Sequence, residues 1–153
     1  MKWSKVIISG ILATFSMDVA MNGAMYFLEM NPTNIHPAAA FLYNLGVEQS
    51  QLATLLHYCY GTLWSVVFVY TFEEDVSEKR GIQLAGVLWL FMMLVYSPII
   101  GWGFFGMGNA KLLTAEHPLY LTSTGEYLFM TLLVHLVYGT VLGFLSRKFV
   151  IQK

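Results

Sequence analysis

Apolar residues along this chain gather in four long runs that polar stretches separate. The runs cover residues 6–28, 52–72, 82–105 and 127–146, and charged side chains lie almost entirely between them. One helix needs about 20 consecutive apolar residues to cross the hydrocarbon core of a bilayer. Lipid cannot satisfy exposed backbone groups, and the runs are too long for the strands of a membrane barrel. The pattern therefore predicts an all-α membrane protein whose residues 1–153 form a single domain of four transmembrane helices.

Composition agrees with this prediction. Hydrophobic residues make up 57% of the chain and charged residues 11%, whereas a soluble domain carries about 25% charged residues. The net charge of −1 gives no indication of nucleic acid as a partner. Cys59 is the single cysteine, which excludes an internal disulfide. The partner that the composition predicts is the lipid bilayer.

The basic residues lie on one side of the predicted bundle. Seven of the eight precede the first run, separate the second from the third, or follow the fourth. These seven are Lys2, Lys5, Lys79, Arg80, Arg147, Lys148 and Lys153. Only Lys111 lies in a connection on the other side. Because basic residues are retained in the cytoplasm, we expect a multi-pass protein of the inner (plasma) membrane with both termini cytoplasmic.

The pattern His-x-x-Tyr-Gly-Thr occurs twice, at 57–62 and at 135–140, so every matched position is 78 residues from its counterpart. Each copy lies in the second run of a pair of runs. The spacing predicts a tandem two-helix pseudo-repeat with units of about 1–72 and 79–149. Two helices per unit preserve orientation, so the units would be related by an axis along the membrane normal.

The two outward connections match more weakly. Each contains a His-Pro pair, at 36–37 and at 117–118, followed by apolar and aromatic residues. Proline is favoured in the first turn of a helix. We therefore expect a short amphipathic helix in each connection.

The two membrane histidines, His57 and His135, are the first candidates for chemistry. Residues four apart share a helix face, so Gly61 and Gly139 lie directly beside them. In one interpretation these small residues let the second and fourth helices cross closely, and the histidines serve only in packing. In another, His57 and His135 are the axial ligands of a b-type haem and the glycines make room for the porphyrin. The two interpretations exclude each other on one face, because close contact leaves no space for a porphyrin.

A polar site is expected beside these histidines. A charged Asp at the centre of a membrane helix costs about 2.5–3.5 kcal/mol, so Asp18 must face the interior of the bundle. Asn22 lies one turn further along the same helix. We expect a contact between Asn22 and His57 or between Asp18 and Tyr60. With Tyr138 from the second unit, these residues predict a site in the outer half of the bundle.

His36 and His117 support a third interpretation, a metal site. With the two membrane histidines they would supply four imidazoles, a donor set that suits Zn or Cu. The sequence contains no pair of histidines at the tight spacing of a metal-binding helix. The metal site therefore depends on how the connections fold.

The segments GILATFSMDVAMNGAMYF and HLVYGTVLG resemble parts of small, uncharacterised four-helix integral membrane proteins of bacteria and archaea. The resemblance implies a polytopic inner-membrane protein and carries no activity over to these residues. From the residues themselves, the leading hypothesis is a ligand-binding or accessory membrane subunit, in its most concrete form a haem b protein.

Three alternative functions stay open. A homodimer or a larger membrane complex would transport protons, cations or a small solute. A purely structural protein would use its histidines only in helix packing. An enzyme that acts on a lipid or a quinone ranks last, because the sequence has no evident nucleophile–base pair or carboxylate pair.

Overall fold

The computed structural model describes residues 3–151, and this part of the chain is built from helices with one isolated β-bridge. Four helices are long and apolar enough to cross a membrane, as the sequence predicted. These are α1 (Trp3–Phe27), α3 (Ser50–Phe72), the segment Glu78–Ile99, and the segment Thr124–Val150. The third combines α4 (Glu78–Phe91), the π-helical turn η2 (Met92–Tyr96) and α5 (Ser97–Ile99). The fourth combines α6 (Thr124–Ser146) with the π-helical turn η5 (Arg147–Ile151).

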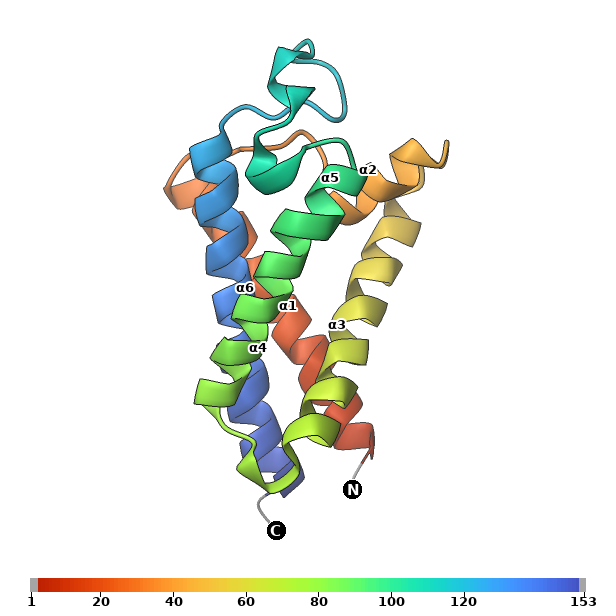
Figure 1. Ribbon diagram of the computed structural model, residues 1–153. Helices are drawn as coiled ribbons and strands as arrows, with labels where there is room; N and C mark the ends of the chain where they lie inside the picture. The colour runs from red at the N-terminus through yellow and green to blue at the C-terminus, as the bar shows by residue number, and fades with distance from the viewer. Residues whose placement is uncertain (1–2, 152–153) are drawn as a thin grey trace.

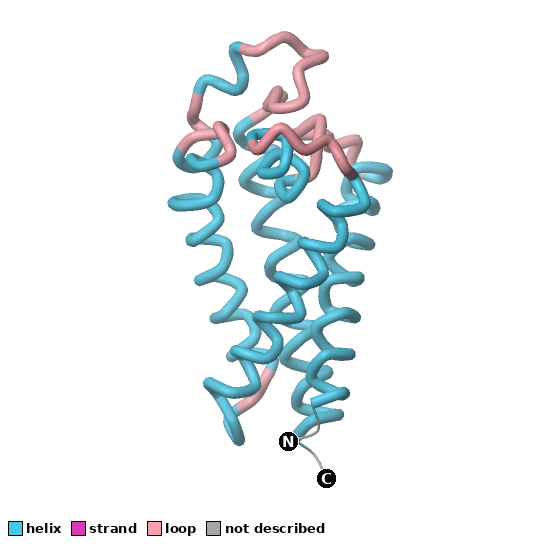
Figure 2. Tube along the Cα trace, turned by 90° about the vertical axis from the view of Figure 1, so that its right-hand side faces the viewer, coloured by secondary structure: helices cyan, strands magenta, loops and turns pink. Residues whose placement is uncertain are grey.

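The long helices run side by side, and both long connections gather at the same end of the bundle (Figures 1 and 2). This end, which also carries α2 (Pro37–Asn44), is called the connection end. At the opposite end, the terminal end, α1 begins, α6 ends, and α3 is joined to α4 through the short 3-10 turn η1 (Glu73–Asp75). An apolar core closes the bundle near the terminal end, and it includes Val6, Phe68, Val69, Tyr138 and Leu142.

The four long helices do not pack equally closely. α1 packs along both α3 and α6, and α4 packs along α6, whereas α3 and α4 meet over only a few residues. In Figure 1, α3 diverges from α4 toward the connection end. α3 and α4 are therefore the least closely packed neighbours among the long helices.

Small residues bring α1 and α3 together. A Cβ atom at Gly61 would collide with Thr14, and one at Gly10 would collide with Ser65. Ser65 is fully buried and its hydroxyl donates to the carbonyl of Val6 at 2.9 Å. The close approach of the two backbones makes this hydrogen bond across the interface possible.

A second set of small residues brings α4 and α6 together. A Cβ atom at Gly81 would collide with the carbonyl oxygen of Gly139, and one at Gly139 with the oxygen of Gly81. Gly143 lies equally close to the backbone of Ser77. The small residues of α3 and α6 therefore pack on α1 and α4, and not on each other as the packing interpretation expected.

The third helix is shorter than its apolar run. It ends at Ile99, one residue after Pro98, which has no N–H to donate. The chain then turns through Gly101 and Gly103, whose φ angles of 93° and 75° are strained for other residues. The remaining apolar residues fold over the connection end, where Trp102 is fully buried and its Nε1–H donates to Leu119 at 3.0 Å.

The two long connections share a local contact but differ in helix content. In the first, Pro37 begins α2, and Nδ1 of His36 accepts the N–H of Ala38 at 3.2 Å. In the second, Nδ1 of His117 accepts the N–H of Leu119 at 3.1 Å, but turns follow in place of a helix. The predicted short helix is confirmed in the first connection and wrong in the second.

Candidate functional site

The bundle contains a cavity of about 670 Å³. Its lining comes from α1, α3, the third and fourth long helices, and the segment 31–38, and most of the lining side chains are apolar. Leu63 of α3 and Phe91 of α4 line the cavity and are 57% and 45% exposed, so the cavity opens between these two helices. A mostly apolar cavity of this size with a few polar groups is typical of small-molecule sites.

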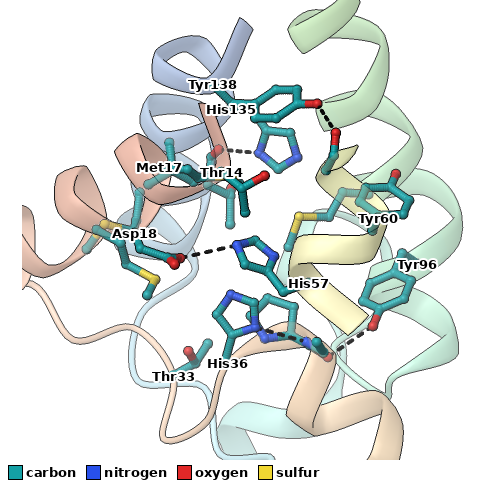
Figure 3. A pocket seen from close by; sticks show the side chains of 18 of the residues that line it. Thr14, Met17, Asp18, Thr33, His36, His57, Tyr60, Tyr96, His135 and Tyr138 are labelled. Atoms are coloured by element: carbon teal, nitrogen blue, oxygen red, sulfur yellow. Dashed lines mark hydrogen bonds and ion pairs between the residues drawn. The ribbon is translucent and has the colours of Figure 1, made fainter. Parts of the chain in front are cut away.

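Three polar side chains meet in the wall of this cavity (Figure 3). Nε2 of His57 lies 3.2 Å from Oδ1 of Asp18, and the ring of His36 lies 4.6 Å from the ring of His57. The hydroxyl of Tyr58 donates to the other carboxylate oxygen of Asp18 at 2.9 Å. Asp18, His36 and His57 are called the Asp–His cluster.

Three separate segments build the Asp–His cluster. α1 supplies Asp18, α3 supplies His57, and the first connection supplies His36 as the N-cap of α2. The capping contact fixes the His36 ring, because its Nδ1 must accept the N–H of Ala38. The cluster also lines a second hollow of about 410 Å³, together with Asn22.

The contact between His57 and Asp18 is an ion-pair contact without hydrogen-bond alignment. Although the two atoms are 3.2 Å apart, the buried Nε2 has no hydrogen-bond partner among the described residues. A neighbouring carboxylate oxygen favours a proton on Nε2, since two facing lone pairs would repel each other.

The pKa of His36 is lowered from 6.5 to about 4. Burial of the ring is the main cause, and the neighbouring His57 adds to it, while the carboxylate of Asp18 acts in the opposite direction. At neutral pH the ring is therefore uncharged. Because Nδ1 accepts a hydrogen bond, the single ring proton lies on Nε2.

His135 lines the same cavity from α6. Its ring is only 7% exposed, and its Nδ1 lies 2.7 Å from the carbonyl oxygen of Thr131. Further toward the terminal end, the buried hydroxyl of Tyr138 donates to the carbonyl oxygen of Gly61 at 2.5 Å. Figure 3 shows His57 between His36 and His135.

The structure brings together most of the site residues that the sequence predicted. The cavity is lined by Asp18, His57, Tyr60, Gly61, His135 and Tyr138, together with the metal candidate His36. Asn22 lies beside the cavity, and its side chain donates to the backbone carbonyl of Asp18. Gly139 lies in the interface with α4, and His117 lies beside Tyr43.

The expected contacts of Asp18 and Asn22 are replaced by others. Asp18 takes His57 and Tyr58 as partners, and the ring of Tyr60 packs edge-on against Trp64 at the opening. Tyr58 was missed, and its position directly after His57 is the one signal for it in the sequence. A stripe of methionines at 17, 21 and 25, spaced four apart on α1, also lines the cavity and was missed.

The Asp–His cluster is a candidate metal site. Each of its three residues offers one ligand atom, and these atoms lie within 4.8 Å of one another. Two imidazoles and one carboxylate suit several first-row metals. The tautomer of His36 opposes such binding, because its Nε2 carries the proton while its Nδ1 caps α2. A metal ion would have to displace that cap.

Fold and site together define a chain with four helices long and apolar enough to cross a membrane, and with a carboxylate–histidine cluster in the wall of a cavity. Comparison with protein-family models, with curated proteins and with solved structures finds no match to this chain. The resemblance to small four-helix membrane proteins therefore stays a prediction.

Proposed function

We propose that this chain is a membrane protein that binds a small amphipathic molecule, whose apolar part occupies the cavity. The observation that carries the proposal is the cavity of about 670 Å³, mostly apolar and lined by the Asp–His cluster and His135. Apolar walls with a few convergent polar groups suit such a ligand, because burial supplies affinity and the polar groups fix orientation.

The ligand enters from the bilayer through the opening between α3 and α4. Leu63 and Phe91 at this opening are exposed on a surface that would face lipid. A molecule already dissolved in the membrane reaches the cavity without crossing water. This route favours lipid-soluble ligands over ions and sugars.

The four long helices cross the membrane with both termini in the cytoplasm. Arg80 and Arg147 lie near the terminal end, where they pair with Asp75 and Glu78. The excess of basic residues in the segments at this end supports a cytoplasmic position. The cavity then opens in the outer half of the membrane.

The chain is a tandem repeat whose symmetry is broken at the cavity. Gly10 lies against Ser65 in the first helix pair as Gly81 lies against Gly143 in the second. Ser65 and Gly143 obey the spacing of 78 residues, whereas Gly10 and Gly81 are 71 residues apart. The repeat relates the contact between α1 and α6 to that between α4 and α3. The first contact is close and the second is open, and this difference makes room for a ligand.

Binding can be measured through Trp64, which lines the cavity. A brominated long-chain alcohol quenches nearby tryptophans, so it is titrated into the full chain reconstituted in nanodiscs. We expect part of the quenching to saturate. This part should disappear in Trp64→Phe, which removes the reporter, and in Val134→Trp, whose larger side chain fills the cavity. In the control Leu132→Trp, on the outer face of α6, saturation should persist. Quenching without saturation in the unmodified chain would contradict the proposal.

A b-type haem between His57 and His135 is the second candidate, favoured by the Nδ1 contact of His135, which leaves Nε2 for a ligand. The geometry at His57 does not fit, because its Nε2 lies only 3.2 Å from Oδ1 of Asp18. The haem stays a prediction. A Soret band that is lost in both His57→Ala and His135→Ala would support it, and a colourless protein from haem-supplied cells would remove it.

Transport receives less support than binding. The histidines lead from the connection end only as far as the cavity, and apolar packing closes the bundle beyond it. Ser65, on the terminal side of the cavity, is fully buried and bonded to the backbone. A path through the whole bundle would require α1 and α3 to separate.

A further inference from the structure

One ring nitrogen of His135 is already engaged in a hydrogen bond within its own helix. Nδ1 lies 2.7 Å from the carbonyl oxygen of Thr131, four residues earlier on α6. A carbonyl oxygen only accepts hydrogen bonds, so Nδ1 carries a proton and donates. A second ring proton would place a charge among apolar neighbours, and Asp18 already faces His57 and Tyr58. The neutral ring therefore presents a lone pair at Nε2.

The hydroxyl groups of Thr14, Thr131 and Tyr138, which line the cavity with His135, do not donate to Nε2. The hydroxyl of Thr14 donates to Gly10, that of Thr131 donates to the backbone of its own helix, and that of Tyr138 donates to Gly61. Among the described residues, Nε2 of His135 has no hydrogen-bond partner. The fully buried N–H groups of His57 (Nε2) and Trp64 (Nε1) line the same cavity but make no hydrogen bond to it. Nε2 of His135 is open to the cavity, so a molecule bound there can supply the donor.

The chemistry of the surroundings selects the kind of donor. A carboxylate group would bring a second negative charge near Asp18, and an ammonium group would be desolvated beside a neutral imidazole. A hydroxyl group is neutral and donates one hydrogen bond. Aromatic side chains around the opening, Tyr60, Trp64 and Phe91, suit either an alkyl chain or a phenolic ring.

We propose that the cavity binds lipid-soluble alcohols or phenols, and that the hydroxyl group of the ligand donates a hydrogen bond to Nε2 of His135. This inference rests on the proposed binding function and names its ligand class. The hydroxyl is recognised by an acceptor held in a single tautomer by α6 itself. The Asp–His cluster lines the same cavity and remains paired.

Competition against the brominated alcohol tests this inference. Decanol is compared with decyl methyl ether, and 4-heptylphenol with its methyl ether, so that each pair differs in the donor. We expect each hydroxyl compound to compete about tenfold more strongly than its ether, since a neutral hydrogen bond changes affinity by about this factor. The two pairs also distinguish an alcohol site from a phenol site.

The variant His135→Phe should reduce the preference for the hydroxyl compounds to less than about twofold. The control His117→Phe, outside the cavity, should retain it. An unchanged preference in His135→Phe, or none in the unmodified chain, would overturn the inference while leaving the cavity intact. If no compound competes and the brominated alcohol does not saturate, the proposed function itself fails.

A measurement on the unmodified chain covers the case in which His135→Phe does not fold. Histidine labelled with ¹⁵N reports which ring nitrogen carries the proton. We expect the unprotonated Nε2 signal of His135 to shift when decanol is added and to stay in place with the ether. A proton found on Nε2 instead of Nδ1 would overturn the inference.

Discussion

A single carboxylate dominates the chemistry of this chain at the scale of residues. Asp18 lies in the middle of α1. Tyr58 of the neighbouring helix donates to one of its oxygens, and Nε2 of His57 lies 3.2 Å from the other. An ionised group in hydrocarbon is tolerated only with such partners. The pairing therefore explains how a charge can be accommodated inside a bundle that is otherwise strongly apolar.

Removing the hydroxyl of Tyr58 should weaken this pairing. We expect Tyr58→Phe to lower the free energy of unfolding in detergent by about 1 kcal/mol, since hydrogen bonds to charged groups contribute about this much or more. The control is Tyr70→Phe on the same helix, whose ring is 70% exposed. Thermal unfolding measures both, and equal melting temperatures would contradict the prediction.

Acid should destabilise the fold through His36. Because its pKa is about 4 in the fold and 6.5 otherwise, the unfolded chain binds more protons between these values. Stability should therefore be complete above pH 6.5 and fall as the pH drops toward 4, by at most about 3 kcal/mol. In His36→Asn, which keeps an acceptor for the N–H of Ala38, the loss should be smaller. The free energy of unfolding is measured from pH 4 to 8 in both proteins. An equal loss toward acid pH in the unmodified chain and in His36→Asn would contradict this assignment.

Small residues decide which helices touch at the scale of elements. Apolar burial does not drive helices together in lipid, so close backbone contact at glycines becomes the main source of attraction. α6 uses Gly139 against Gly81 of α4, and α3 uses Gly61 against Thr14 of α1. Among the described residues no glycine joins α3 to α4 in this way, and these two helices pack loosely.

Two alanine substitutions should act in opposite directions. Gly139→Ala places a methyl group against Gly81 and Ala85, so it should destabilise the chain by about 1–3 kcal/mol. Gly86→Ala on α4 has nothing within 4 Å, so better helix propensity should leave stability unchanged or raise it by up to about 1 kcal/mol. Thermal unfolding in one detergent compares them. Equal tolerance of both would show that the interface of α4 and α6 is not close-packed.

The position of the cavity depends on the orientation of the whole molecule. If the terminal end is cytoplasmic, the connection end faces outward and the ligand site lies in the outer half of the membrane. The two long connections also contact each other, since the side chain of Asn34 donates to the carbonyls of Ala115 and His117. The cap over the site is therefore built from both halves of the chain.

Thiol labelling in intact cells tests the orientation. In a Cys59→Ser background, we expect a membrane-impermeant reagent to label Leu112→Cys, which lies in an exposed part of the second outward connection. Glu73→Cys, in the turn between α3 and α4, should react only after lysis. The reverse pattern would place the cavity on the cytoplasmic side.

Sequence reasoning succeeded where the decisive forces are local. The four long helices follow from apolar runs whose backbone must bond within itself, and Pro37 marked the start of α2. It was less accurate in the third run, which it extended to Phe105, because hydropathy does not register the turn at Gly101 and Gly103. It proposed His57 and Asp18 but not their contact with each other.

The sequence by itself determined the number of long helices, their approximate bounds and the residues that hydrocarbon would reject. Tertiary structure alone decided that His36 joins Asp18 and His57, that the small residues pair α3 with α1 and α6 with α4, and that a cavity remains between α3 and α4. The physical reason is the distance along the chain over which the deciding interactions act. Helix formation in lipid depends on neighbouring residues, whereas the site depends on how distant backbones pack and how a connection folds back over them.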